Sequence, residues 1–97
     1  HLETHWSLDD LAKKMNVSKS YLEHVFKEET GKTIHRFGEE ARVKEAKKLL
    51  LETDLPIGEV AHFVGYDDPN YFVKIFKRYE KETPSSFRNH NNAREVL

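Results

Sequence analysis

Thr33–Asp54, with the sequence TIHRFGEEARVKEAKKLLLETD, decides the fold, because it has the pattern of one long helix between two similar segments. Thr33 is a favourable N-cap, and most residues after it are strong helix formers. Asp54 and Pro56 are typical of a helix end. From Ile34 to Thr53 the helix would span about 30 Å, since each residue adds roughly 1.5 Å. The sequence therefore predicts a long linking helix at the centre of the chain.

The segment before the linking helix has the pattern of a helix-turn-helix motif. Ser7 begins a capping box, and Leu8–Met15 carries an apolar stripe at helical spacing. After a short turn, Ser18 is placed to cap a second helix, and Gly31 is suited to end it in a left-handed conformation. His1–Trp6 is interpreted as the end of a truncated first helix. The residues of the second helix that are predicted to face inward are Tyr21, Leu22, Val25 and Phe26.

The same pattern returns after the linking helix, at an offset of about 50 residues. The apolar positions of the first unit correspond to Ile57, Val60, Ala61, Val64, Tyr71, Phe72, Ile75 and Phe76. The repeat predicts a helix over Pro56–Val64 and another that begins at Pro69 and ends at Glu80. Asp68 is the expected cap of the second of these helices. A short last helix is predicted after Thr83.

The fold class predicted from these patterns is all-α, with two helix-turn-helix subdomains joined by the linking helix. About seven helices are expected, the first of them truncated. Residues 1–32 are assigned to the first subdomain, 33–54 to the linking helix, 55–90 to the second subdomain and 91–97 to a C-terminal tail. The aromatic residues expected in the core, rather than as platforms for stacking bases, are Tyr21, Phe26, Phe37, Tyr71, Phe76 and Phe87.

The composition limits the functions that the chain can have. Its 97 residues form one domain or two small subdomains, and no segment is long and apolar enough to cross a membrane. Cys is absent, which excludes disulfides, Cys-based zinc sites and thiol nucleophiles. His1 and His5 have the spacing of metal ligands but no supporting partner, so no metal or other cofactor is expected. The remaining histidines form no catalytic arrangement, so the chain is not expected to be an enzyme.

In each unit the second helix leaves polar and basic side chains on its outer face. A helix in the major groove of DNA reads base edges with short or flexible polar side chains and meets phosphates with basic ones. The predicted base-reading residues are Ser20, Glu23, His24, Asn70, Val73 and Lys74, where Glu23 would accept from cytosine and Val73 would touch a thymine methyl. The predicted phosphate contacts are Lys19, Lys27, Lys77 and Arg78.

The length of the linking helix matches this interpretation. Successive major grooves on one face of B-DNA are about 34 Å apart, close to the span of the predicted helix. One chain could therefore place two recognition helices in adjacent grooves. The net charge of −1 does not favour nucleic acid, so the interpretation depends on where the charges lie. The alternative, which the near-neutral charge favours, is a helical adaptor that binds a partner protein and no DNA.

The residues also match a known family. The matching segments are SLDDLAKKMNVSKSYLEHVFKEETGKT from Ser7, ARVKEAKKLLLETDLPIGEVAHFVGYDDPNYFVKIFKRY from Ala41 and TPSSFR from Thr83. Together they resemble the DNA-binding domain of the AraC/XylS family of bacterial transcription regulators. The resemblance implies a seven-helix domain that binds promoter DNA through two adjacent segments of the major groove. It also implies a cytoplasmic protein, often an activator, that carries a further effector-sensing or dimerising domain and often recruits RNA polymerase.

The sequence departs from the family pattern at several positions. Lys81 stands where the family usually has Gly, so a left-handed C-cap there would cost roughly 1 kcal/mol. Gly38 lies inside the linking helix, where a larger apolar residue is usual. The leading helix is shorter than in the family, and Glu23 makes the first recognition helix less basic than the second.

Overall fold

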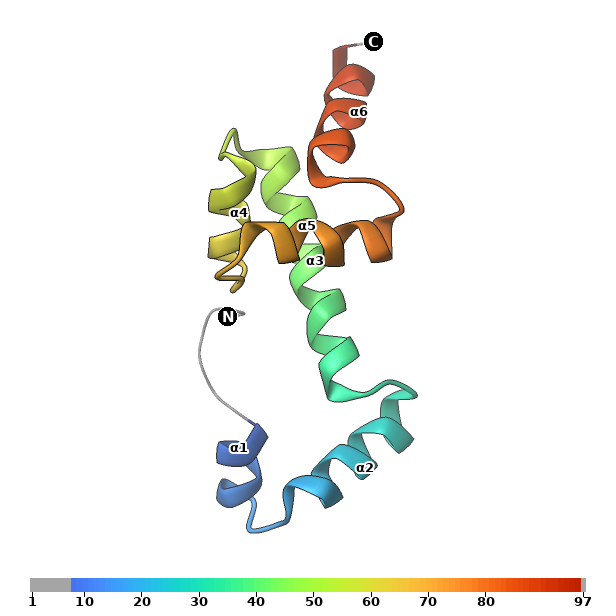
Figure 1. Cartoon of the computed structure of the whole chain (residues 1–97). Coiled ribbons are helices and arrows are strands. Elements are labelled where there is room, and N and C mark those ends of the chain that lie inside the picture. The colour runs from blue at the N-terminus through green and yellow to red at the C-terminus, as the bar shows by residue number, and fades with distance from the viewer. Residues whose placement is uncertain (1–7, 97) are drawn as a thin grey trace.

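The computed structural model describes the backbone of residues 8–96 and the side chains of residues 8–92. The described part is all-α (Figure 1), as predicted, and contains no strand. The truncated helix expected at His1–Trp6 lies outside the described residues. The six helices are α1 (Leu8–Lys14), α2 (Lys19–Thr30), α3 (Ile34–Glu52), α4 (Ile57–Phe63), α5 (Pro69–Glu80) and α6 (Pro84–Val96).

Helix α3 is the axis of an elongated molecule with extents of 53 × 24 × 20 Å. Figure 1 shows α1 and α2 at one end of α3 and the helices α4, α5 and α6 around its other half. The Thr33 side chain accepts a hydrogen bond from the Arg36 backbone N–H at 3.1 Å, which confirms Thr33 as the N-cap. The helix continues without a break past Gly38, and its 19 residues correspond to about 28 Å.

The predicted repeat is present in the backbone. Helices α2 and α5 each have 12 residues, and their N-caps are Ser18 and Asp68, whose side chains accept from backbone N–H groups of the first turn. Each helix also ends in the left-handed conformation, at Gly31 with φ 77° and at Lys81 with φ 67°. Lys81, which stands where the family usually has Gly, therefore adopts the conformation that usually favours glycine.

The hydrophobic core lies in the second unit, between α3, α4, α5 and α6. Its buried side chains are Val43, Ala46, Leu50, Val60, Ala61, Val64, Tyr66, Phe72, Ile75 and Phe76. Phe87 on α6 adds an edge-to-face contact with Phe76, with ring centroids 5.7 Å apart. The Arg88 side chain donates to the carbonyl oxygens of Leu50 at 3.0 Å and Thr53 at 3.2 Å. Arg88 thus satisfies carbonyl groups at the end of α3 and fastens α6 to it.

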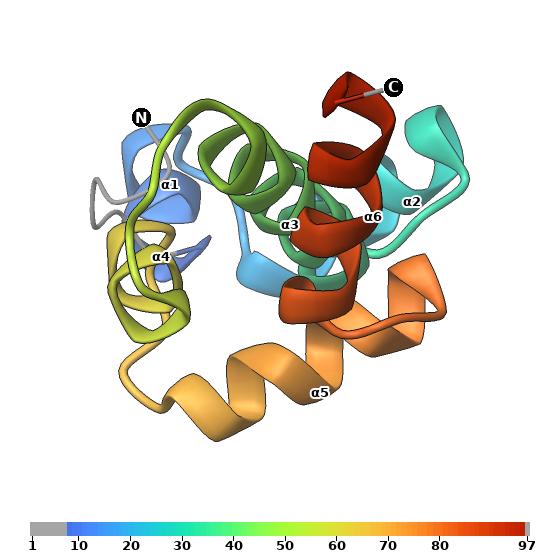
Figure 2. The same cartoon turned by 90° about the horizontal axis from the view of Figure 1, so that it is seen from above.

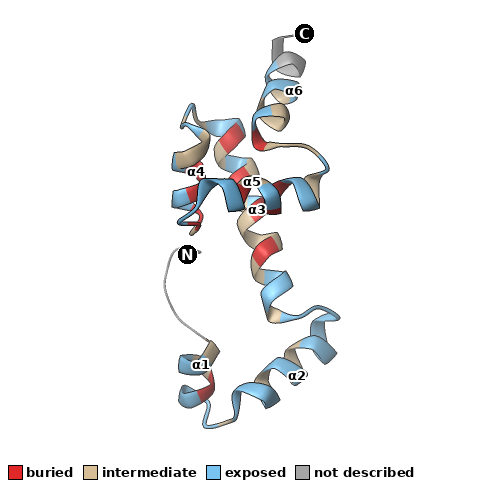
Figure 3. Ribbon diagram, in the orientation of Figure 1, coloured by how far each residue is buried: buried red, intermediate tan, exposed pale blue. Residues whose placement is uncertain are grey.

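The first unit is packed much more loosely, as the pale blue α1 and α2 in Figure 3 show. Among residues 8–33, only Ala12 is buried. Phe26 touches Phe37 edge-on, with ring centroids 5.3 Å apart, and this contact joins α2 to α3. Tyr21 is 57% exposed and Phe37 is 50% exposed, so the prediction that both are core residues is wrong. Phe37 does face α2, where it contacts Phe26, but the described residues of the first unit leave half of its surface exposed.

The exposure of Tyr71 and the length of the last helix also differ from the prediction. Tyr71 is exposed at the edge of the core, where its ring lies 5.9 Å from that of Tyr66. Helix α6 is longer than predicted and continues to Val96, through most of the segment expected to be a tail. Neither Gly nor Pro interrupts α6 after Pro84, so nothing in the sequence stops the helix earlier. None of the helices between residues 8 and 96 combines the length and apolar character needed to span a bilayer.

Candidate nucleic-acid interface

Helices α2 and α5 are the second helices of their pairs, and they point the same way. In Figure 1 both run from left to right, with α2 below α5, so their N-termini lie on the same side of the molecule. Figure 2 shows α5 on the outside of the molecule, away from the axis of α3. Two helices that run in a similar direction at separate heights along one axis are suited to a long, repetitive ligand such as a DNA groove.

The outer face of α5 is defined by the residues that it buries. Phe72, Ile75 and Phe76 are completely buried, which fixes the rotation of the helix about its axis. Four of the predicted site residues are consequently exposed on α5, namely Asn70, Lys74, Lys77 and Arg78. In the part of the chain that the structure describes, neither Lys74 nor Lys77 is paired with a carboxylate. Both ammonium groups are therefore available to a ligand.

Val73 departs from its predicted position on the outer face. Its side chain is only half-exposed and packs in part against the core of the second unit. Because it lies between the buried face and the exposed face, only part of its surface is open to a ligand.

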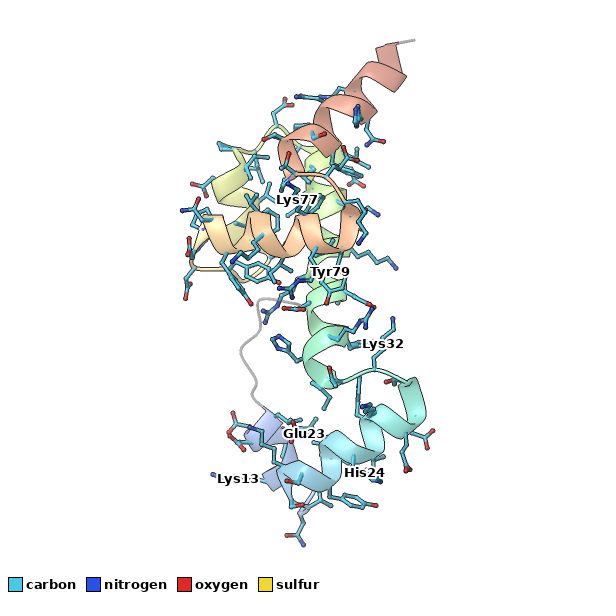
Figure 4. The ribbon with its side chains drawn as sticks, turned by 45° about the vertical axis from the view of Figure 1, so that its right-hand side comes forward. Lys13, Glu23, His24, Lys32, Lys77 and Tyr79 are labelled. Carbon is cyan, nitrogen blue, oxygen red and sulfur yellow. The ribbon has the colours of Figure 1, made fainter. Side chains whose placement is uncertain are left out.

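On α2 the predicted residues Lys19, Ser20, Glu23, His24 and Lys27 are all exposed. His24 lies close to an acidic neighbour one turn along, with its Nε2 atom 3.1 Å from a carboxylate oxygen of Glu28. Figure 4 shows Glu23 nearer to α1 than His24. The structure thus places these five side chains on one accessible helix, but α2 itself buries no residue and is held less firmly than α5.

The two helices differ in charge as well as in packing. Helix α5 carries Lys74, Lys77 and Arg78 against one acidic residue, Glu80, which is paired with Lys47 at 3.0 Å. The charged residues of α2 are Lys19, Lys27, Glu23, Glu28 and Glu29. Since phosphates attract cations and repel carboxylates, α5 is the more favourable helix for contact with a nucleic-acid backbone.

One residue next to this interface was missed by the sequence analysis. Glu39 on α3 is buried, with 6% of its surface exposed, and its carboxylate lies beneath α5. It accepts a hydrogen bond from the Tyr79 hydroxyl at 2.6 Å and lies 3.9 Å from Nη1 of Arg78. The signal was present in the sequence, because Glu39 is in helical phase with the buried residues Val43 and Ala46. A carboxylate within an apolar stripe indicates a specific partner.

Among the described side chains, no group of three or more His, Asp or Glu residues is arranged to hold a metal ion.

Comparison with known proteins identifies a helix-turn-helix domain along most of the chain. A family model described as "Helix-turn-helix domain" matches residues 11–90. The arabinose operon regulatory protein of Salmonella typhimurium is 35% identical over 86 residues, which are 89% of this chain and 31% of that protein. The Msm operon regulatory protein of Streptococcus mutans is 38% identical over 81 residues, which are 84% of this chain and 29% of that protein. The chain thus spans less than a third of the length of these relatives.

Solved structures show the same architecture. The C-terminal domain of AraT, a response regulator from Geobacillus stearothermophilus, matches with a TM-score of 0.85 and 35% identity, over 93% of this chain and 75% of that one. The DNA-binding domain of AdpA, a global transcriptional factor solved with a target DNA, matches with a TM-score of 0.90 and 26% identity, over 100% of this chain and 87% of that one.

The fold and the matched family define the chain as a helix-turn-helix domain of a DNA-binding transcription regulator. Within that class, the chain belongs to the AraC/XylS family, as its sequence motifs and its operon-regulator relatives agree. The family consists of transcription regulators rather than enzymes.

Proposed function

We propose that the chain binds promoter DNA by placing α2 and α5 in two adjacent segments of the major groove, with α5 supplying most of the affinity. The observation that carries this proposal is the basic outer face of α5, which is held in place by a completely buried inner face. The length of α3 supports it, because about 28 Å is close to the spacing of about 34 Å between successive grooves. In this proposal residues 1–32 and 55–90 are two reading subdomains, residues 33–54 link them and residues 91–97 lie outside both.

The residues near the N-terminus of each helix read base edges. On α5, Asn70 is suited to adenine and Lys74 to guanine, because their side chains match the groups on those bases. Val73 offers the exposed part of its side chain to a thymine methyl. On α2 the same task falls to Ser20, Glu23 and His24, which are exposed along that helix.

Phosphate contacts fall to the basic residues on the flanks of the two helices. They are Lys19 and Lys27 on α2 and Lys77 and Arg78 on α5. These contacts bind every DNA sequence alike and fix the register of the protein on the duplex. They also make the affinity fall as the salt concentration rises.

The parent protein, in this proposal, is a bacterial cytoplasmic regulator, and an activator, that acts on the nucleoid. It carries an effector-sensing or dimerising domain in addition to this chain and contacts RNA polymerase. Support comes from the relatives, which are operon regulators more than three times as long as the matched segment.

Selection of bound sequences from a random pool of double-stranded DNA tests the proposal. The expected result is a bipartite motif whose half-sites are centred about one helical turn apart, 10 to 10.5 base pairs. A single short motif would refute simultaneous binding by both helices. If no sequence is enriched, and the chain shows no salt-dependent affinity for DNA, the result would instead favour an adaptor that binds a partner protein.

Lys74→Ala and Lys77→Ala form a matched pair of variants on α5, because both side chains are exposed and unpaired with carboxylates among the described residues. Lys74→Ala should cost about 1 to 3 kcal/mol on the selected sequence and much less on random DNA, since it removes a base contact. Lys77→Ala should weaken binding to both DNAs alike and reduce the salt dependence. Fluorescence titration with labelled duplexes measures both effects, and equal losses on both DNAs for Lys74→Ala would refute its base-reading role.

A further inference from the structure

A buried carboxylate lies where the linking helix passes under the second recognition helix. The Oε1 atom of Glu39 accepts from the Tyr79 hydroxyl at 2.6 Å, and its Oε2 atom lies 3.1 Å from Nε2 of His35. Figure 4 shows Tyr79 on the side of α5 that faces α3. Burial, and then the hydrogen bond to Glu39, raise the pKa of Tyr79 to about 12, so the phenol remains protonated and donates throughout the physiological pH range.

Arg78 is the group through which this carboxylate reaches the DNA-facing surface. Its Nη1 atom lies 3.9 Å from Oε1 of Glu39, the same oxygen that accepts from Tyr79. The Arg78 side chain is 59% exposed, so it also extends into solvent on the outer side of α5. Lys77, one residue earlier, has no carboxylate partner among the described residues. Of the two basic residues at the end of α5, only Arg78 is therefore drawn toward the interior.

We propose that Glu39 is a positioning residue for DNA binding, whose carboxylate draws the Arg78 guanidinium toward α3 and so limits its contact with the DNA backbone. This inference rests on the proposed function, in which Arg78 contacts a phosphate. The guanidinium has two possible anionic partners, the fixed carboxylate and the incoming phosphate, and each weakens its interaction with the other. The competition lowers the sequence-independent part of the affinity, because phosphate contacts supply that part.

The competition has a functional consequence. A regulator must find one site among a large excess of other DNA, so it must not be held tightly at non-specific sites. Weakening one phosphate contact reduces binding to every sequence by a similar factor, so the discrimination between bases by Asn70 and Lys74 is kept while less of the protein is held on other DNA. Glu39 would thus restrain the chain from binding indiscriminately, while its hydrogen bond to Tyr79 keeps α5 in position.

Glu39→Gln separates these two tasks, because its amide oxygen still accepts from Tyr79 while the charge is lost. The binding of a random-sequence duplex should tighten about two- to fivefold, as expected for release of a long ion pair whose cation is mostly exposed. The salt dependence should steepen by up to about one additional counterion. Both effects should disappear when Arg78→Ala is present in the same chain. Glu40→Gln is the matched control, since Glu40 loses the same charge one residue away but pairs with Lys32 and Arg36 instead.

Circular dichroism first establishes that each variant is folded, and Glu39→Met, which has similar volume and no charge, provides a second test if Glu39→Gln is unstable. The inference is overturned if neither variant tightens binding, or if the increase persists with Arg78→Ala or equals that of Glu40→Gln. Even if the inference is overturned in this way, the proposed function stands provided that Arg78→Ala alone weakens DNA binding. If Arg78→Ala alone changes nothing, the phosphate contact itself is refuted, and the inference fails with it.

Discussion

Lys81→Gly should make the chain more stable, because the C-cap of α5 is held in a conformation that suits glycine. Lys81 has φ 67° and ψ 10°, and its backbone N–H donates to the Lys77 carbonyl oxygen at 2.9 Å. Gly31 does the same at the end of α2, with φ 77° and a hydrogen bond of 2.7 Å to Lys27. The repeat thus provides an internal example of the favoured residue.

The size of the effect follows from three contributions. A residue with a side chain costs about 1 to 2 kcal/mol in the left-handed region, and glycine removes this cost. Glycine also makes the unfolded chain more flexible, which takes back roughly 0.5 to 1 kcal/mol. The exposed hydrogen bond from Lys81 Nζ to the Arg78 carbonyl, at 3.3 Å, is lost but contributes little. The net stabilisation should be about 0.5 to 1 kcal/mol, or a rise in Tm of about 2 to 8 °C for a domain of this size.

Thermal and urea unfolding followed by far-ultraviolet circular dichroism measure this change. Lys81→Ala is the control, because it removes the side-chain hydrogen bond and keeps the backbone strain, so its stability should stay close to that of the unmodified chain. Gly31→Ala should lower stability, since its added Cβ has open space around it and only the left-handed backbone opposes it. The reasoning is refuted if Lys81→Gly is no more stable than Lys81→Ala.

Three further substitutions test other parts of the structure. Gly38→Ala should raise the urea midpoint, by up to about 1 kcal/mol of stability, because the new Cβ meets nothing within 4 Å and alanine favours a helix. Arg88→Ala should cost about 2 to 3 kcal/mol in the same assay, because it removes charge-assisted hydrogen bonds to Leu50 and Thr53. Tyr79→Phe should make the free energy of unfolding fall less steeply as the pH rises above about 9. The phenol of Tyr79 stabilises the fold fully below its unfolded pKa of about 10, and this contribution is lost as the pH rises toward the folded pKa of about 12. Urea unfolding between about pH 9 and pH 12 compares the two chains.

Each of these predictions has an outcome that contradicts it. A lower midpoint for Gly38→Ala would show that the space beside this glycine is filled when the chain is in solution. Arg88→Lys with full stability would mean that one charge at the end of α3 suffices without the paired hydrogen bonds. If the free energy of unfolding falls equally with pH for Tyr79→Phe and the unmodified chain, the pKa of Tyr79 is not raised by folding.

Features that depend on local chemistry were predicted correctly from the sequence. The N-caps at Thr33, Ser18 and Asp68 are present, as are the left-handed C-cap at Gly31 and the non-glycine C-cap at Lys81. Each depends on a few neighbouring residues, because a cap satisfies backbone groups within one turn. The repeat also placed α4 and α5 to within one residue at each end.

Burial could not be predicted in the same way, because helical spacing shows which residues share a face but not whether another element covers it. Leu22 and Phe26 lie on one face of α2, yet both are only half-buried, Phe26 against Phe37. The corresponding face of α5 buries Phe72 and Phe76 completely, because α3, α4 and α6 surround it. The two repeated sequences therefore have similar patterns and very different surroundings.

The contacts of Glu39 could be anticipated only in part. Its helical phase with Val43 and Ala46 indicates that it faces the core, but its partners Tyr79 and Arg78 are about 40 residues away in the sequence, and no spacing rule connects positions so distant. The phosphate role of Arg78 was predicted from its charge and its expected exposure alone, which give no information about its partners within the fold. The structure adds that a second anion lies within reach of the same guanidinium.

Helix α3 contacts α2 and α5 through residues that lie within one of its turns, and these contacts differ in kind. Phe37 packs on α2 through one ring contact, whereas Glu39, two residues later, holds α5 through a partly buried hydrogen bond from Tyr79. A rotation of α3 at this point would change both contacts at once, so the direction of α2 relative to α5 is set where the helix passes between them. In the proposed function, α5 binds DNA without rearrangement, because it has a buried inner face and a basic outer face. Helix α2 has no buried residue and mixed charges, so in the same proposal it adds sequence discrimination after α5 has aligned the chain on the duplex.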